Sequence, residues 1–101
     1  MDYRKMASQL LPLIGGKENV SKATHCVTRL RLILADNTKY DKKALEELDG
    51  VKGVFFNSGQ LQIIYGTKTV DAVYAEFLIM TGLGESTVAE VKKEGTEDLK
   101  P

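Results

Sequence analysis

Residues 24–35, THCVTRLRLILA, predict a β-hairpin that decides the fold. Its second strand, Arg29–Ala35, alternates from one residue to the next, so its leucines should face the core while its arginines face away. The first strand is expected to be short, Thr24–Cys26, and a tight connection at residues 26–28 joins the two. The hairpin therefore has one apolar face and one basic face.

The sequence downstream predicts a short helix and a second hairpin. Residues 36–38 are expected to form a turn, and Asp41 is a suitable N-cap for a helix that runs through Asp49. Two apolar runs follow, Gly53–Asn57 and Gln60–Tyr65. A Ser-Gly pair joins them, as is typical of a hairpin turn.

Longer amphipathic helices are predicted on both sides of this region. Residues 2–14 carry apolar side chains at helical spacing, but Pro12 should kink or end the helix, and Gly15-Gly16 should stop it. The last helix follows a break at Gly66-Thr67 and runs to about Thr81. Its apolar side consists of Val70, Val73, Tyr74 and Phe77.

The predicted order is helix, hairpin, helix, hairpin, helix. Because each hairpin has one apolar face, the economical arrangement is an α+β fold, a four-stranded antiparallel sheet with three helices packed on one face. The other face of the sheet is left to solvent or to a partner. We expect residues 1–82 to form this domain and residues 83–101 to be a polar linker, with a short helix over Val88–Lys93.

The composition narrows the possible classes of function. The 101 residues suit one compact domain, and 14 basic residues balance 14 acidic ones, so no basic excess points to nucleic acid. One cysteine and one histidine provide neither an intramolecular disulfide nor a Cys/His metal cluster. No apolar stretch approaches the roughly 20 residues of a membrane span, and no signal peptide is evident. We therefore expect a soluble domain of a reducing compartment.

The single cysteine, Cys26, lies in the predicted turn. Residues 19–35 contain no carboxylate and three basic side chains, those of Lys22, Arg29 and Arg31. Positive charge favours a thiolate over a thiol. The Thr28 hydroxyl and the free N–H groups of a turn can cradle a tetrahedral anion. This equipment suits the acceptance of a phosphoryl group, which needs positioning and charge stabilisation more than covalent machinery.

Other interpretations of these residues stay open at this point. A lone cysteine is most often a small core residue, and arginines on an open sheet face can be merely solvated. His25 should point away from Cys26, which indicates a packed or capped histidine rather than a base. A cysteine phosphatase is disfavoured because four residues separate Cys26 from Arg31 and a strand follows. A non-catalytic binding module is the remaining alternative, and an absent aromatic platform disfavours RNA as its ligand.

The segment His-Cys-Val-Thr-Arg-Leu-Arg, residues 25–31, resembles a known phosphorylation-site signature. The signature belongs to the enzyme IIB domains of the bacterial phosphoenolpyruvate-dependent sugar phosphotransferase system, in the glucose/sucrose/β-glucoside superfamily. The resemblance runs from about Tyr3 to Thr81. It includes residues 15–20, residues 48–54 and the later run Gly-Gln-Leu-Gln-Ile-Ile-Tyr-Gly. It implies a sheet of four antiparallel strands with three helices on one face, in agreement with the predicted fold.

The resemblance also implies roles for the matching positions. Cys26 would be the phosphocysteine, which takes a phosphoryl group from a phosphohistidine on a IIA protein and passes it to a sugar held by a membrane-embedded IIC domain. The activity would be that of a protein-phosphohistidine–sugar phosphotransferase. Arg29 and Arg31 match two arginines that support transfer to the sugar, Thr28 would help to hold the phosphate, and Gln62 belongs to a motif near the site. No cofactor or metal is implied.

Further features concern the sugar and the parent protein. The residues around Cys26 resemble the sucrose and trehalose branch, and the stretches 81–87 and 90–93 look most like trehalose-type transporters, so one of these two sugars is favoured. The chain would then be the IIB part of a longer IIBC protein at the cytoplasmic face of the bacterial plasma membrane. Pro12 departs from the unbroken first helix of the family, which bears on the geometry of that helix and not on the chemistry.

Overall fold

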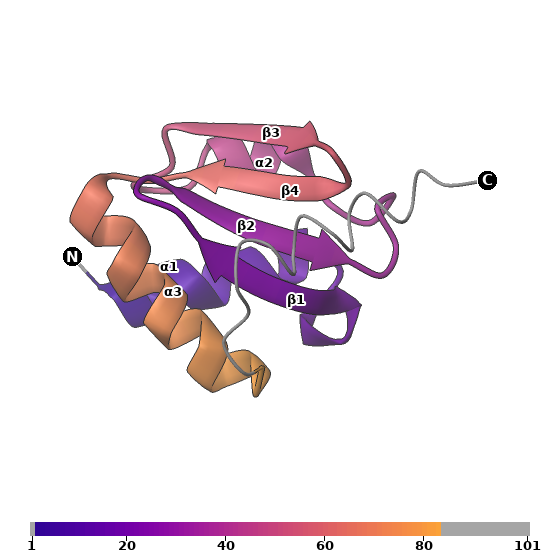
Figure 1. Ribbon diagram of the computed structural model, residues 1–101, viewed down its shortest axis with the longest axis horizontal. Coiled ribbons are helices and arrows are strands. Elements are labelled where there is room, and N and C mark those ends of the chain that lie inside the picture. The colour runs from indigo at the N-terminus through magenta and orange to yellow at the C-terminus, as the bar shows by residue number, and fades with distance from the viewer. Residues whose placement is uncertain (1, 84–101) are drawn as a thin grey trace.

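A single antiparallel sheet organises the chain in the computed structural model, which describes residues 2–83 (Figure 1). Its four strands lie in the order β1-β2-β4-β3. They are β1 (Val20–His25), β2 (Arg29–Leu34), β3 (Gly53–Asn57) and β4 (Gln60–Ile64). Strands β2 and β4 are therefore central, and β1 and β3 form the edges.

The helices cover one face of this sheet and enclose the core, which confirms the predicted α+β fold. They are α1 (Tyr3–Leu10), α2 (Lys42–Glu46) and α3 (Thr67–Thr81). Helices α1 and α3 lie side by side, while α2 is close to β3 (Figure 1). None of the helices within residues 2–83 is long and apolar enough to cross a membrane. The predicted linker and the short helix over residues 88–93 lie outside the described residues.

Strand β2 shows why the predicted alternation was informative. Its leucines at positions 30, 32 and 34 are buried in the core, at 0%, 0% and 3% exposure. Arg29 and Arg31 lie on the opposite face and are half-buried. The sheet therefore separates an apolar side, packed under helices, from a side that carries the basic residues.

Strand β1 is longer than predicted. It spans Val20–His25 rather than Thr24–Cys26, so it starts earlier and leaves Cys26 in the turn. The register against β2 shifts between Val20 and Lys22, which is a β-bulge or irregularity. A bulge interrupts the two-residue alternation, and for this reason the first half of the strand has no recognisable pattern in the sequence.

The first helix ends earlier than the 2–14 range that the spacing predicts. Helix α1 begins with Asp2 as N-cap, whose carboxylate accepts from the Lys5 N–H at 3.0 Å, and it stops at Leu10. Residues 11–13 form a 3₁₀ turn around Pro12. Proline cannot donate the hydrogen bond that an α-helix needs at this point, so the expected effect of Pro12 is confirmed.

Helix α2 starts as predicted and ends early. The Asp41 carboxylate accepts from the Ala44 N–H at 3.1 Å, which confirms the N-cap. The helix stops at Glu46 instead of continuing through residue 49, because the next N–H groups bond three residues back, as Leu48 does to Leu45 at 3.2 Å. The chain tightens into successive turns and reaches Gly50.

Gly50 offers a test of this tight connection. Its φ is +84°, and a Cβ at this position would lie 2.6 Å from the Met6 side chain. We expect Gly50→Ala to lower the free energy of unfolding by about 1–2 kcal/mol, chiefly because of the left-handed backbone. Chemical denaturation measures this loss. The neighbouring exposed substitution Asp49→Ala is the control and should change stability by less than about 0.5 kcal/mol; equal effects of the two substitutions would contradict the expectation.

Candidate functional site

The turn between β1 and β2 holds the predicted site, at the left-hand end of the sheet in Figure 1. The Cys26 N–H donates to the Arg29 carbonyl at 2.9 Å and closes the turn. The Thr28 carbonyl accepts from the Tyr65 N–H at 2.8 Å, which ties the turn to the end of β4. The turn is thus fixed from both sides. Cys26 itself is half-buried and not sealed in the core.

The tip of this turn has unused donors. Within residues 2–83, neither the Val27 N–H nor the Thr28 N–H donates to a backbone carbonyl. The Val27 side chain is 72% exposed, so the tip projects from the molecular surface. Successive N–H groups in a turn can bind an anion, so these two stay candidate donors for one.

Arg31 lies directly against the cysteine. Its Nε donates to the Cys26 sulfur at 3.1 Å, and its Nη1 donates to the Gln60 amide oxygen at 2.9 Å. Arg31 pairs across the sheet with Gln62, so Gln60 is its diagonal neighbour, within reach of a long side chain. The guanidinium is therefore held between the sulfur and a buried amide.

Arg29 is held by a parallel arrangement but does not touch the sulfur. Its Nη1 donates to the Gln62 amide oxygen at 2.7 Å, and its guanidinium carbon lies 5.6 Å from the centre of the Phe55 ring. The ring face attracts the cation and shields part of it from water. The two predicted arginines thus occupy the same sheet face at different distances from Cys26.

Gln60 is a site residue that the sequence analysis did not identify. The Gln62 amide nitrogen donates to the Gln60 oxygen at 3.1 Å, so the two glutamines join the arginines into one network. Gln60 is 2% exposed and Gln62 is 4% exposed. One signal was available: both are polar residues two apart on a predicted strand, and therefore share the face that carries the arginines.

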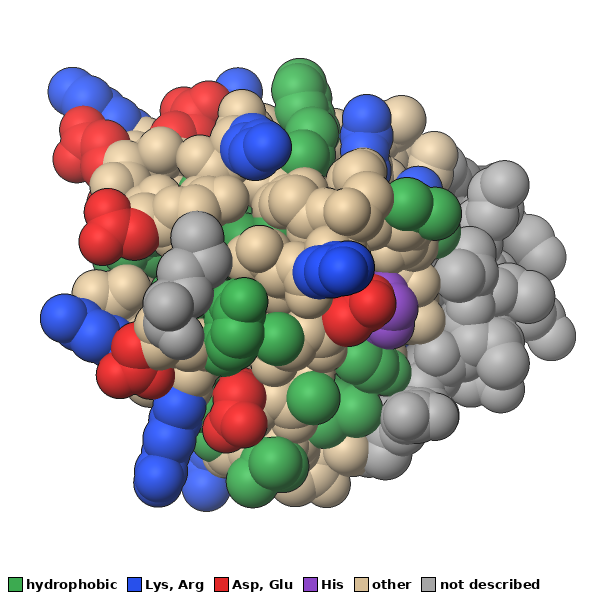
Figure 2. All heavy atoms as spheres, turned by 90° about the vertical axis from the view of Figure 1, so that its left-hand side faces the viewer, with side chains coloured by type: hydrophobic (Ala, Val, Ile, Leu, Met, Phe, Trp, Pro, Cys, Tyr) green, Lys and Arg blue, Asp and Glu red, His purple; other side chains and the backbone are tan. Residues whose placement is uncertain are grey.

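His25 is held on the helix side of the sheet. Its Nδ1 lies 3.0 Å from the Cys26 carbonyl oxygen and 3.3 Å from the Asp71 carboxylate. Both neighbours are acceptors, so Nδ1 carries the proton and donates. The ring also packs on Tyr74, with 4.6 Å between centres. His25 is a packed, hydrogen-bonded residue, as predicted, and in Figure 2 it lies beside an acidic side chain.

Tyr65, which bonds to the turn, is not a candidate base. Its side chain is 1% exposed, and this burial raises the pKa of Tyr65 well above its usual value. The hydroxyl stays protonated at physiological pH. Tyr65 contributes to the site through its backbone N–H, which anchors Thr28.

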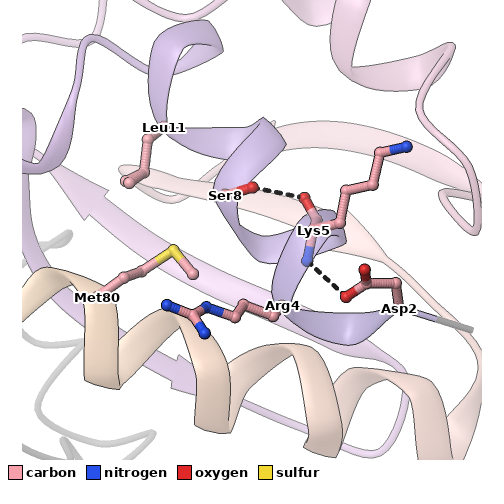
Figure 3. A pocket seen from close by; sticks show the side chains of 6 residues that line it. All are labelled: Asp2, Arg4, Lys5, Ser8, Leu11 and Met80. Carbon is pink, nitrogen blue, oxygen red and sulfur yellow. Dashed lines mark hydrogen bonds between the residues drawn. The ribbon is translucent and has the colours of Figure 1, made fainter.

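A separate groove lies between α1 and the end of α3, away from Cys26 (Figure 3). It has a volume of about 490 Å³ and is lined by Asp2, Arg4, Lys5, Ser8, Leu11 and Met80. Two of its polar groups are engaged within α1, since Asp2 accepts from the Lys5 N–H and Ser8 donates to the Lys5 carbonyl. None of the predicted site residues lines this groove, so the candidate site remains the turn.

The geometry also bears on the phosphatase alternative. The residues that follow Cys26 continue into strand β2, which starts at Arg29. A phosphate loop that opens a helix, as a cysteine phosphatase needs, is therefore absent after Cys26 in the described part of the chain.

Comparisons with known proteins point to one family. A family model described as "phosphotransferase system, EIIB" matches residues 8–41. The chain is 48% identical over 101 residues to the sucrose-specific EIIBC component of the PTS system from Klebsiella pneumoniae. This match covers 100% of this chain and 22% of that protein. It is 47% identical over 100 residues to the trehalose-specific EIIBC component from Bacillus subtilis. That match covers 99% of this chain and 21% of that protein.

A solved structure is similar over most of the described domain. A crystal structure of one domain of the PTS system IIabc component from Clostridium difficile has 46% sequence identity and a TM-score of 0.77. The match covers 84% of this chain and 87% of that one. The chain thus matches one such domain almost end to end but spans only about a fifth of the length of its curated relatives, 22% for the sucrose-specific one.

Proposed function

The chain belongs to the EIIB family of the phosphotransferase system, and from this premise we propose that Cys26 is its phosphoryl acceptor. The Cys26 thiolate attacks the phosphorus of a phosphohistidine on a IIA protein, so an S–P bond forms as the N–P bond breaks. A sugar hydroxyl held by a IIC domain then attacks the same phosphorus and gives its proton to a base of the IIC domain or to water, while the S–P bond breaks and the sulfur leaves as a thiolate. The observation that carries this proposal is the 3.1 Å contact between Arg31 Nε and the sulfur.

The surroundings of the sulfur support the loading step. The free N–H groups of Val27 and Thr28 and the Thr28 hydroxyl are donors for the phosphoryl oxygens, which carry the charge of the transition state. The half-buried sulfur and the projecting turn leave room for an incoming phosphohistidine. Such preorganised donors act without reorganisation when the charge arrives.

The arginine contact supports the delivery step more strongly. When the S–P bond breaks, negative charge returns to the sulfur, and Arg31 Nε is in place to receive it. In the loading step the negative charge on the sulfur decreases as the S–P bond forms, so the same contact lowers that barrier less. Arg31, and Arg29 beside it, are therefore assigned to the transfer from sulfur to sugar.

The sugar and the partners follow from the relatives. Sucrose and trehalose are the sugars named for two EIIBC relatives that match 100% and 99% of this chain, so one of these two is the proposed acceptor. Those relatives combine EIIB with EIIC in one chain, which supports an IIC domain in the same parent protein. The proposal places residues 1–82 as the IIB domain on the cytoplasmic side of the membrane and residues 83–101 as a linker toward IIC.

The decisive experiment is an intact-mass measurement. The chain is incubated with phosphoenolpyruvate, the general phosphotransfer proteins and a IIA protein of the sucrose or trehalose class. We expect a mass gain of one phosphoryl group, located on Cys26 by peptide sequencing and absent when IIA is omitted. An unchanged mass with a IIA that loads a known EIIB domain, or a phosphoryl group on His25, would contradict the proposal.

A further inference from the structure

Gln60 accepts two hydrogen bonds through one amide oxygen. Arg31 Nη1 donates to it at 2.9 Å, and Gln62 Nε2 donates to it at 3.1 Å. The Gln60 side chain is 2% exposed, so water hardly competes for this oxygen. Hydrogen bonds in such surroundings are stronger than in water.

Two contacts restrict the Arg31 guanidinium, one to the Cys26 sulfur and one to Gln60. The group is planar and rigid, whereas the chain that carries it rotates freely. A single contact to the sulfur would leave its plane and position variable. The contacts to the sulfur at 3.1 Å and to Gln60 at 2.9 Å together fix both.

We propose that Gln60 is a positioning residue, which holds the Arg31 guanidinium against the Cys26 sulfur. The Gln60 amide oxygen accepts from Arg31 and Gln62, and of these two only Arg31 donates to the sulfur, so Gln60 is linked to the sulfur through Arg31. The expected effect on phosphoryl transfer rests on the proposed function. The expected effect on the reactivity of the Cys26 sulfur does not.

The position of Gln60 separates this role from a purely structural one. Its neighbours on β4, Leu61 and Ile63, are fully buried, at 0% exposure each, and belong to the core. Gln60 points to the opposite face, as alternation along a strand requires. An apolar replacement of similar length therefore removes the bond to Arg31 and leaves the core side chains in place.

The test replaces Gln60 with methionine, which lacks the acceptor. Alkylation of Cys26 by iodoacetamide at neutral pH should slow by roughly threefold, because a displaced Arg31 no longer donates to the sulfur and stabilises negative charge on it less. Transfer of the phosphoryl group from preloaded Cys26 to sugar should slow by roughly 10- to 100-fold, as expected for a misplaced catalytic group. The loading rate from phosphorylated IIA should fall less than the delivery rate, and the IIA concentration for half-maximal loading should not change.

A double variant identifies the route of the effect. If Gln60 acts through Arg31, then adding Gln60→Met to Arg31→Gln should cause no further loss in alkylation or in delivery. The inference would be overturned if the rate losses of the two single variants multiplied in the double variant. It would also be overturned if Gln60→Met had the alkylation and delivery rates of the wild type. Gln60→Asn has a shorter side chain that does not reach Arg31, so the same losses in alkylation and delivery are expected. It replaces Gln60→Met in the test if the methionine variant does not fold.

Val54→Ala is the matched control for stability. Val54 is buried at 1% exposure on the core face of the adjacent strand β3, and none of the four network residues contacts it by a hydrogen bond. The Val54→Ala substitution should destabilise the domain without changing the rate at which Cys26 is alkylated. If the wild-type chain gains no phosphoryl group, the proposed function fails; the alkylation measurement needs no phosphate and still decides the role of Gln60.

Discussion

Replacing Cys26 with serine is expected to abolish phosphoryl uptake from phosphorylated IIA. A serine hydroxyl keeps the position of the sulfur but is not ionised at neutral pH, so it is a weak nucleophile without an adjacent base. The surrounding residues provide no such base: the His25 ring lies on the helix side of the sheet, against Asp71 and Tyr74, and Tyr65 is buried with a raised pKa. The loading rate should fall by a factor on the order of 10³ or more.

The measurement is the intact mass of the variant after incubation with phosphoenolpyruvate and the complete set of upstream proteins. His25→Gln is the matched control, because it changes the residue next to the cysteine and should retain the phosphoryl gain. Chemical denaturation confirms that both variants fold. Uptake that persists in Cys26→Ser and disappears in His25→Gln would show that the histidine is the acceptor.

The second large effect is expected for the arginines. Changing either Arg29 or Arg31 to glutamine should spare loading from IIA and impair delivery to sugar. Arg31→Gln should have the larger effect, because only Arg31 donates to the sulfur, whereas Arg29 bonds to Gln62 and lies over Phe55. Loss of one preorganised donor typically lowers a rate by roughly 10²- to 10³-fold, which is the expected loss in delivery for Arg31→Gln.

Delivery is measured as a single turnover. The variants are first loaded to completion with labelled phosphate. They are then added, with sucrose or trehalose, to membrane vesicles that contain an EIIBC relative whose own phosphorylatable cysteine has been replaced. The wild-type domain sets the reference rate. Arg31→Lys retains the charge but not the planar guanidinium, so its delivery rate should lie between those of the wild type and Arg31→Gln. Equal losses in loading and delivery would contradict this division of roles.

Much of the fold was predictable because its signals are local. The alternation of Arg29–Leu34 identified a strand and its core face, and the burial of its leucines confirms this. Asp41 identified the start of α2, and the apolar spacing after residue 67 identified α3, whose buried residues are Val70, Val73, Tyr74 and Phe77. These features depend on a few neighbouring residues, so the sequence contains them directly.

The boundaries that were missed depend on interruptions of such patterns. Strand β1 begins at Val20, but its irregular register with β2 removes the alternation on which the prediction depended. Helix α2 ends at Glu46 because the chain changes to tighter turns, and no single residue marks this change. The roles assigned to Cys26, Thr28, Arg29 and Arg31 stay predictions that the experiments above address.

The linear order of residues was enough to indicate the family, the two faces of β2 and the isolated thiol in a basic turn. It was not enough to reveal that Arg31 donates a hydrogen bond to Gln60, which is 29 positions away. That relation exists because β4 inserts next to β2, so the sheet order is β1-β2-β4-β3. Local periodicity specifies which face a side chain occupies, whereas long-range packing of apolar faces selects which strands become neighbours and in which register. The environment of the sulfur is therefore a property of the folded sheet.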